Sequence, residues 1–171
     1  GRRTPETVIL ASDGMTDPFR DGSGPATGFG GEVYIESPAL VGADFDTIRT
    51  SWELDSLRNF AATVADMGGI TGHLERFGVV SMELYAPDGS AEEMVSGDRI
   101  GIMIGLEAPG RPAEVSVAPG ETIRMIPITL LTPGETAHIV DGGAAGRREV
   151  AGRLLGTGVG VVSVVGRPSV V

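Results

Sequence analysis

The chain of 171 residues contains no cysteine and no lysine. Without cysteine it forms neither disulfides nor a thiolate nucleophile, and because this composition fits a reducing compartment we expect a cytoplasmic protein. Without lysine it offers no Schiff-base amine and no P-loop lysine for phosphate binding. These two absences exclude several large classes of enzyme before any motif is considered.

Long apolar runs and an excess of positive charge are also missing. No segment approaches the ~20 apolar residues that a membrane-spanning helix needs. The 23 acidic residues against 13 arginines give a net charge of −10, which disfavours contact with nucleic-acid phosphates. We therefore expect neither a membrane nor a nucleic-acid partner. The negative charge is compatible with a basic protein partner, although a role in solubility alone is the interpretation that we favour.

Strand signals recur along most of the chain, as short stretches of alternating apolar residues bounded by Gly, Pro or Asp. They cover residues 6–12, 30–37, 78–90 (a strand and then a turn), 98–107, and 113–131 (a hairpin with a Pro-Gly turn). In 30–37, Val33 and Ile35 alternate with Glu32, Tyr34 and Glu36, which predicts a strand with one buried and one exposed face.

The stretch 98–107 places Ile100, Ile102, Ile104 and Leu106 on one face and glycines opposite them. Because glycine has no side chain to occupy that face, we expect another backbone or a helix to approach it closely.

The clearest helix is 51–69, where Leu57, Phe60 and Val64 follow helical spacing. Ser51 or the preceding threonine can cap its start, and Gly68-Gly69 can end it. The tryptophan at position 52 is expected to hold this helix against the sheet.

A second helical region begins at Thr132, where an N-cap residue, a proline and an acid at the third helical position form a capping signature. We expect one helix to about residue 140, a break at Gly142-Gly143, and a second helix over about 145–155. The second helix should turn Val150, Leu154 and Leu155 inward. The valine-rich segment 159–165 is expected to form a last strand, or an arm that reaches a partner.

Together these elements predict one α+β domain over 1–171, with a core over 6–156 and a valine-rich C-terminal strand or arm over 157–171. The sheet should be mixed and largely antiparallel, because the expected strands mostly follow one another without intervening helices. We expect about six or seven strands, one long central helix and two short C-terminal helices.

The stretch "ILASDGMTDPF" poses the main functional question, because it could be a turn after a strand or a reactive site. Asp-Gly at a strand end is typical of a turn, and we favour that interpretation. Loops on rigid scaffolds often carry recognition, so the loop is also our candidate for partner binding. The candidate residues are Asp13, Met15, Thr16, Asp17, Phe19 and Asp21.

Other chemical signatures are incomplete. His73 and Glu75 have the H-x-E spacing of zinc deaminases, but the cysteines that complete such a site are absent. The glycine-rich stretch 22–31 precedes a strand rather than a helix, so it does not match a phosphate-binding loop. We expect no metal, no cofactor and no catalytic residue, with an enzyme that uses Asp13, Thr16 and His73 as the alternative.

The order of several motifs resembles that of the suppressor of fused family. An early strand leads into "SDGMTD", and a glutamate-containing strand ends in proline at "GGEVYIESP". The helix "SWELDSLRNFAATVADMG" follows, and "IPITLLTPGETAHIVDGGAAGRREVAGRLL" closes the pattern. The likeness spans about residues 6–156. Thr16 and Ile128 depart from the family pattern, as does the Pro-Gly pair ahead of Glu135.

This resemblance implies an α/β sandwich-like domain that binds other proteins and carries out no catalysis. Some bacterial members of the family are proposed immunity proteins, which neutralise secreted toxins. We therefore expect a non-catalytic protein-binding domain, and as a more specific form an immunity protein against a basic toxin. A structural subunit of a homodimer, paired through its valine-rich tail, is a further alternative.

Overall fold

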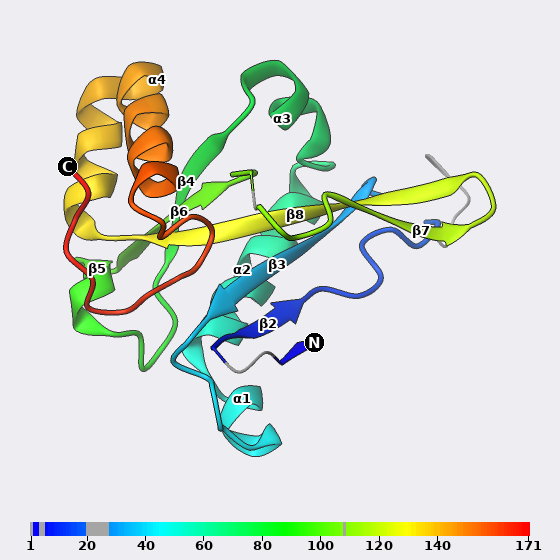
Figure 1. Ribbon diagram of the computed structural model, residues 1–171, viewed down its shortest axis with the longest axis horizontal. Helices are drawn as coiled ribbons and strands as arrows, with labels where there is room; N and C mark the ends of the chain where they lie inside the picture. The colour runs from blue at the N-terminus through cyan, green and yellow to red at the C-terminus, as the bar shows by residue number, and fades with distance from the viewer. Residues whose placement is uncertain (1, 4–5, 20–27, 108) are drawn as a thin grey trace.

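A computed structural model describes residues 2–3, 6–19, 28–107 and 109–171 of the chain (Figure 1). The helices are α1 (Phe45–Arg49), α2 (Trp52–Asp66), α3 (Thr71–Phe77) and α4 (Pro133–Gly156), with a short 3₁₀ turn η1 (Glu92–Met94). The strands are β1 (Arg2–Arg3), β2 (Val8–Ala11), β3 (Gly31–Ser37), β4 (Val80–Tyr85), β5 (Val95–Ser96), β6 (Arg99–Ile104), β7 (Glu114–Ala118) and β8 (Glu121–Leu131).

The strands form one eight-stranded sheet in the order β1-β2-β3-β8-β6-β4, with β5 paired to β6 and β7 paired to β8. Among the pairs of named strands, only β3 and β8 run parallel. The expected α+β class with a mixed, largely antiparallel sheet is therefore confirmed. The two shortest strands, β1 and β5, and the helices α1 and α3 were not anticipated from the sequence.

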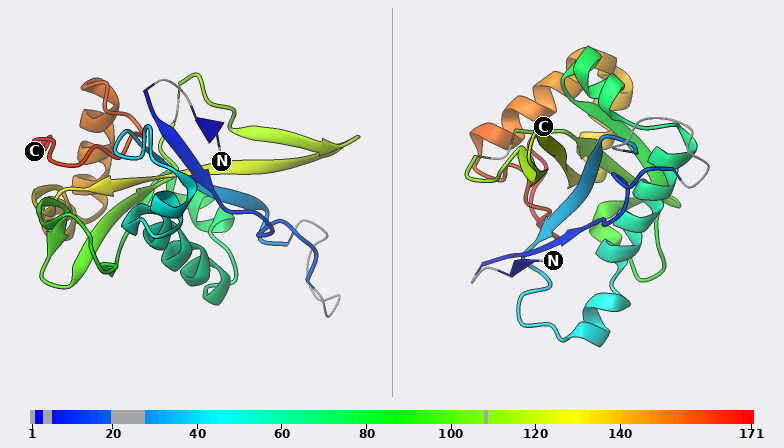
Figure 2. Two further views of the ribbon diagram at one scale, coloured as in Figure 1. Left: turned by 90° about the horizontal axis from the view of Figure 1, so that it is seen from below. Right: turned by 90° about the vertical axis from the view of Figure 1, so that its right-hand side faces the viewer.

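Helices cover the two faces of the sheet unequally. The helix α2 lies against one face, and α4 lies on the other, over the end formed by β4, β6 and β8 (Figure 2). The larger core cluster joins α2 to the sheet through Phe60, Val64 and the isoleucines of β6. A smaller cluster joins α4 to the sheet through Met103, Val150 and Leu154. None of the described helices covers the part of the second face over β2 and β3.

The helix α2 forms where its apolar spacing predicts it. Ser51 caps its start and accepts a hydrogen bond from the amide of Leu54. Leu57, Phe60 and Val64 are buried, as expected, and Trp52 packs at the edge of the same core. Burying such side chains contributes roughly 1.5–3 kcal/mol each, which makes this helix the main support of the sheet.

The glycine face of β6 does receive a helix. A Cβ atom added to Gly101 would lie 2.0 Å from the hydroxyl oxygen of Thr136 in the first turn of α4. The expected close approach at this face is therefore confirmed. The alternation, however, ends at Gly105: Leu106 joins the smaller core cluster under α4 rather than the isoleucine cluster.

The expectation of one exposed face on β3 is wrong, because all seven residues of this strand are buried. Val33 and Ile35 face the α2 core, as predicted. Glu32 and Glu36 lie on the opposite face, but each accepts hydrogen bonds from segments that fold over it. The strand is therefore buried on both faces although its sequence alternates.

The helix α4 begins with the capping box that the sequence predicts. The amide of Glu135 donates to the Thr132 hydroxyl, and the Thr132 amide donates back to the Glu135 carboxylate over 3.0 Å. The helix is interrupted at Gly143, whose φ of 56° lies outside the helical region. Val150 and Leu154 point inward as expected, but Leu155 is 39% exposed, so the expectation for Leu155 is wrong.

The two parts of α4 meet at Gly146, and this contact predicts an effect on stability. A Cβ atom on Gly146 would lie 2.6 Å from the backbone oxygen of His138, which cannot move aside as a side chain could. We expect Gly146→Ala to lower the free energy of unfolding by about 1–3 kcal/mol, measured by urea denaturation.

Gly152 is the matched control, since it lies in the same helix and has open space around its Cα atom. There, Gly152→Ala should raise the free energy of unfolding by up to about 1 kcal/mol through helix propensity. Equal effects of the two substitutions would contradict the close contact at the break.

The C-terminal segment after α4 folds back onto its own chain. It contains no strand: the only sheet pairing within 157–171 is an isolated bridge between Val162 and Glu36. Beside that bridge, the amide of Ser163 donates to the Glu36 carbonyl over 2.7 Å, and the Ser163 hydroxyl accepts from the Leu130 amide over 3.0 Å. The tail thus joins β3 and β8 beyond the point where the two strands stop pairing with each other. The expected strand over 159–165 is not formed.

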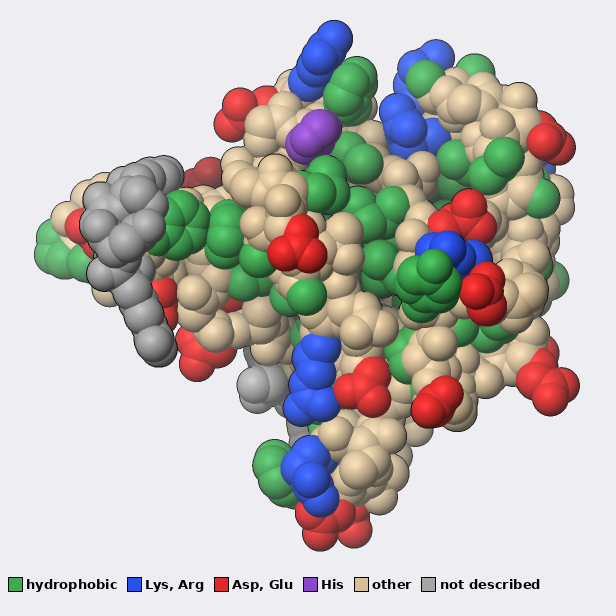
Figure 3. All heavy atoms as spheres, turned by 180° about the vertical axis from the view of Figure 1, so that it is seen from behind, with side chains coloured by type: hydrophobic (Ala, Val, Ile, Leu, Met, Phe, Trp, Pro, Cys, Tyr) green, Lys and Arg blue, Asp and Glu red, His purple; other side chains and the backbone are tan. Residues whose placement is uncertain are grey.

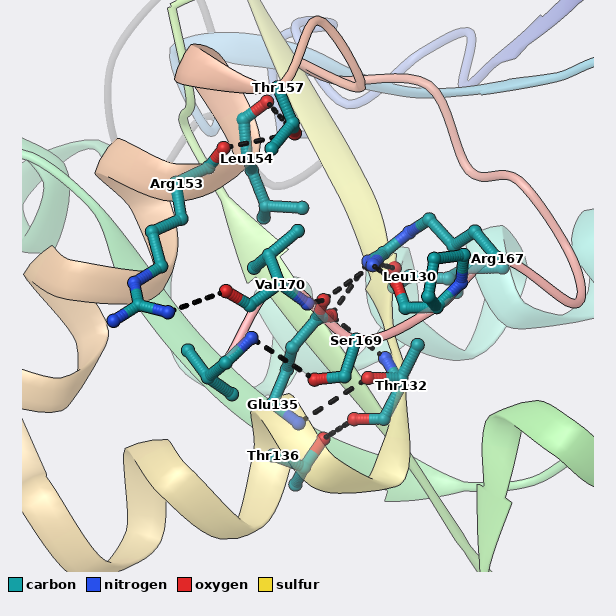
Figure 4. A network of polar contacts seen from close by, with 12 residues as sticks. Leu130, Thr132, Glu135, Thr136, Arg153, Leu154, Thr157, Arg167, Ser169 and Val170 are labelled. Carbon is teal, nitrogen blue, oxygen red and sulfur yellow. Dashed lines mark hydrogen bonds and ion pairs between the residues drawn. The ribbon is translucent and has the colours of Figure 1, made fainter.

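A buried ion pair fastens the end of this tail to the start of α4 (Figure 4). The side chain of Arg167 is 5% exposed and that of Glu135 is not exposed at all. Arg167 donates to both carboxylate oxygens of Glu135, and the amide of Val170 donates to one of them. Burial alone would raise the pKa of Glu135, but the hydrogen bonds from Arg167 and from the amides of Thr132 and Val170 outweigh it and hold this pKa below its usual value.

Candidate functional site

Glu32 organises the first loop, and sequence reasoning missed its role. This carboxylate of β3 is 5% exposed. It accepts hydrogen bonds from the hydroxyls of Ser12, over 2.5 Å, and Thr16, over 2.8 Å. The amides of Gly14 and Thr16 also donate to it, over 3.2 and 3.0 Å. The stretch "SDGMTD" therefore fixes the exit of the chain from β2, as the turn interpretation predicts.

Some of the candidate binding residues of this loop are exposed, and others make contacts within the protein. Asp13 and Asp17 are exposed, whereas Met15 packs against the main core. The Thr16 hydroxyl donates a hydrogen bond to Glu32. The ring of Phe19 lies edge-on to that of Phe29, with the ring centroids 4.9 Å apart. The sixth candidate, Asp21, lies outside the described residues. Of the five candidates that the structure describes, only Asp13 and Asp17 are exposed.

Removing the Glu32 carboxylate should release this loop. Glu32→Ala leaves the Thr16 hydroxyl without its acceptor and leaves the Ser12 hydroxyl only the longer bond to the Val33 carbonyl, and we expect a loss on the order of 2 kcal/mol in the free energy of unfolding. The amides of Gly14 and Thr16, which donate to Glu32, should exchange with deuterium faster in NMR experiments. The exposed Asp13→Ala is the control, and unchanged exchange at both amides in Glu32→Ala would contradict this role.

The alternative enzyme site is not assembled in the structure. Asp13 and His73 are both exposed, and His73 lies on α3 rather than in the first loop. Within the described ranges, no hydrogen bond joins Asp13, Thr16 or His73 to one another, and the Thr16 hydroxyl donates to Glu32. A nucleophilic hydroxyl needs a base within hydrogen-bond reach. The geometry therefore gives this alternative no support.

The segment 105–113 creates a second candidate site, because it leaves the sheet between two strands that both pair with β8. At one end the Gly105 amide donates to the Pro127 carbonyl, and at the other the Met125 amide donates to the Ala113 carbonyl. Gly105 and Ala113 are eight positions apart in the sequence, but the β8 residues that they bond, Pro127 and Met125, are only two positions apart. We call this segment the excursion.

The excursion explains why β8 tolerates a proline at position 127. Proline has no backbone N–H, so in the middle of a sheet it normally removes a ladder hydrogen bond. Here the ladder on the β6 side of β8 is already broken by the excursion, between the bonds at Gly105 and Ala113. The proline therefore leaves no acceptor unsatisfied at this point, and β8 continues through it.

The excursion carries Arg111 to β3, where it meets Glu36. The side chain of Glu36 is 1% exposed and that of Arg111 is 32% exposed. Arg111 donates to the Glu36 carboxylate through Nε over 3.0 Å and through Nη2 over 2.5 Å, so it binds both carboxylate oxygens in a bidentate, side-on geometry. The Thr7 hydroxyl adds a third bond to Glu36. Burial would raise the pKa of Glu36, but Arg111 and Thr7 outweigh it and hold this pKa below its usual value.

Tyr34 lies beside this ion pair, on the same face of β3. Burial, and after it the negative charge of Glu36, raise the pKa of Tyr34 to about 12. The phenol therefore stays protonated at all physiological pH values, and it can act as a hydrogen-bond donor but not as a base. A proton-transfer role for Tyr34 at neutral pH is thereby disfavoured.

Arg111 borders three hollows in the surface. One, of about 430 Å³, lies between the excursion and β8 and is also lined by Tyr34 and Arg124. A second, of about 250 Å³, is mainly apolar and opens over the sheet face beside Val115. A third, of about 510 Å³, lies between the excursion and residues 158–162 of the tail. Three hollows of the described surface thus meet at Arg111 of the excursion.

Glu53 is a further buried carboxylate, in the first turn of α2. Its burial raises its pKa, against weaker opposing hydrogen bonds from its own backbone and from Ser37. Within the described residues no three His, Cys, Asp or Glu side chains are grouped so that they could hold a metal ion. None of the described helices combines the length and the apolar character needed to cross a membrane.

Comparison with models of protein families, with curated proteins and with solved structures finds no match for this chain. The resemblance to the suppressor of fused family therefore stays a prediction that rests on the motifs alone.

Proposed function

We propose that this chain is a non-catalytic protein-binding domain, and that its contact surface is the sheet face left without a helix. The observation that carries the proposal is an apolar strip on this face, made of Ile9, Ala11, Tyr34, Met125 and Val115. These residues come from four strands that lie side by side in the sheet. The strip leads to the hollow of about 250 Å³, which can receive one apolar side chain of a partner.

The hairpin of β7 and β8 extends the strip away from the body of the molecule (Figure 1). Along β7, Val115 is 38% exposed and Val117 is 55% exposed. Among the described strands, β7 pairs only with β8, so its outer edge is open to an extended segment of another chain. An exposed edge with apolar side chains beside an apolar hollow is a typical protein-binding surface.

The charge of the chain favours a basic partner. With a net charge of −10, the domain attracts positively charged proteins and speeds their encounter. The acidic side chains are spread over the face seen from behind rather than gathered in one patch (Figure 3). The charge therefore serves long-range attraction, while the apolar strip supplies the specific contact.

Crosslinking from the strip tests this proposal. A photo-reactive phenylalanine analogue at position 115 should capture a basic protein of the source cell, whereas the same group at position 45 on α1 should not. Phe45 is 73% exposed, so both positions are accessible. The captured protein is then purified, and Val115→Thr together with Val117→Thr should weaken its binding about tenfold, because each change removes apolar contact area.

Each other outcome of this experiment counts against the proposal. Equal capture from positions 115 and 45 would mean that the strip is not the contact surface. Capture of a second copy of this chain alone would favour the homodimer alternative. Binding that does not weaken as salt concentration rises would remove the role of the negative charge.

A toxin-neutralising immunity role in the cytoplasm is the more specific form of the proposal. Its support is the resemblance of the motifs together with the acidic charge, which suits a toxin with a basic active site. Co-expression with the product of a neighbouring toxin gene should restore growth of the host. Failure to restore growth would remove this form and leave the general protein-binding proposal in place.

A further inference from the structure

The outer edge of β7 presents a defined set of backbone groups. In an antiparallel pair, residues whose amide and carbonyl groups face the partner strand alternate with residues whose groups face away from it. The Ala113 carbonyl accepts a hydrogen bond from the amide of Met125 in β8, so Ala113 faces β8, and so does Val115 two positions later. The amide and carbonyl groups of Glu114 and Ser116 therefore point outward, where an added strand would bond to them.

The two faces of the sheet differ in character along this edge. Val115 belongs to the apolar strip and borders the hollow of about 250 Å³. Because side chains alternate along a strand, Glu114 points to the opposite face. There it lines a polar hollow of about 430 Å³, together with Glu75 of α3 and Arg124 of β8. An added strand would thus meet an apolar surface on one face and a charged one on the other.

The charges that line this polar hollow leave it negative. Its two glutamates, Glu75 and Glu114, outnumber Arg124. The other residues that line it are uncharged: Gly30, Thr71 and Ala113. Neighbouring strands lie about 5 Å apart, so a side chain beside Glu114 on an added strand would be about 10 Å from the strand that carries Arg124. A basic side chain there is attracted by Glu114 more strongly than it is repelled by Arg124.

From this arrangement we propose that the outer edge of β7 binds an extended segment with a basic residue beside Glu114 and an apolar residue on either side of it. This inference rests on the proposed protein-binding function and specifies the kind of partner. Hydrogen bonds to the outward groups of Glu114 and Ser116 hold the segment, and its alternating side chains decide which segments fit. The apolar side chains lie on the face of the strip near Val115, while the basic side chain pairs with Glu114.

Titration of the full chain with synthetic peptides, followed by NMR of the backbone amides, tests this specificity. The probe is a heptapeptide of alternating valine and lysine with blocked ends, and two comparison peptides carry serine or glutamate in place of lysine. The lysine peptide should bind most tightly and the glutamate peptide least. In its complex the amides of Glu114 and Ser116 should exchange with deuterium more slowly. The Val115 amide, which already faces β8, should exchange as before.

Replacement of Glu114 tests the charge without disturbing the core, because this residue is exposed. Glu114→Gln should lower the preference for the lysine peptide over the serine peptide about threefold, as expected for one partly exposed ion pair. Glu114→Lys should lower it further. The control is Glu93→Gln, which makes the same change in net charge at an exposed position of η1 and should leave the preference unchanged.

An equal loss of preference in Glu114→Gln and Glu93→Gln would assign the preference to net charge and overturn the proposal. So would an unchanged preference in Glu114→Gln, unchanged exchange at the amides of Glu114 and Ser116, or the absence of saturable binding. If the crosslink from position 115 captures a protein while the peptide results fail, the strip still binds a partner, and only the strand addition is rejected. Failure of both experiments rejects the proposed function as well.

Discussion

Replacing Arg167 by leucine is expected to lower the free energy of unfolding by about 3–5 kcal/mol, because it leaves a buried carboxylate without its cation. Glu135 has no exposed side-chain surface, so solvent cannot compensate for the lost guanidinium. Two hydrogen bonds to the carboxylate disappear, together with one from Arg167 to the Leu130 carbonyl. Urea denaturation of the variant and the wild-type chain measures the difference.

The double variant Glu135→Gln with Arg167→Leu is the control for charge. Glutamine still accepts the amide hydrogen bond of Thr132 that completes the capping box, but it brings no buried charge. We therefore expect the double variant to be more stable than Arg167→Leu alone. If the double variant were the less stable of the two, the loss would come from packing rather than from an uncompensated carboxylate.

The Glu135–Arg167 ion pair also predicts how stability depends on pH, and the sign of the Glu135 contribution differs between the wild type and Arg167→Leu. In the wild type the pKa of Glu135 is lowered, so its contribution is present above the unfolded-state pKa and is lost as the pH falls through the lower folded-state value. Without Arg167, burial raises the pKa of Glu135 and only the amide hydrogen bonds of Thr132 and Val170 oppose it, so we expect the variant to lose most stability at neutral pH, where this carboxylate is charged. The stability gap should therefore narrow as the pH is lowered from neutral to about 4.

Local signals in the sequence predicted the elements of the fold well where short-range physics decides. The capping box at Thr132 and the apolar spacing of α2 depend on residues within a few positions of one another, and both are confirmed. The glycine face of β6 also predicted a close neighbour, although not that Thr136 of α4 would be the residue in contact. Such signals establish an element or a face, but they do not name the partner.

The candidate sites depend on contacts that the sequence pattern does not encode. The alternation in β3 correctly indicated a strand, yet Glu36 is buried because Arg111, 75 positions away, folds over it. Glu32 is buried by the loop that precedes β3, and Glu135 by a tail that returns from 32 positions later. A glutamate opposite two apolar residues normally indicates a solvent-facing side. Only the tertiary structure reveals that these three carboxylates hold segments together.

Removing the tail is expected to have the largest effect of all, because the tail hydrogen-bonds to β3 and β8 and contributes Val161 to the core. Deletion of residues 159–171 leaves Thr157 and Gly158 to end α4 but removes the buried side chains of Val161, Ser163 and Arg167. The Leu130 amide and the Glu135 carboxylate lose their partners at the same time. Most domains are stable by roughly 5–15 kcal/mol, and the summed loss exceeds the lower end of this range. We therefore expect the truncated chain to show no cooperative unfolding transition at room temperature.

A peptide of residues 159–171, added to the truncated chain, distinguishes this role from that of a dimerisation arm. If the tail completes its own domain, the peptide should restore the cooperative transition, and a peptide with Arg167→Leu should restore it poorly. An arm that served a second copy would instead leave a folded truncated monomer, and sedimentation would reveal only a halved mass. Because Ser163 joins β3 to β8 within one chain, we expect the first result and a truncated chain that is unfolded until the peptide binds.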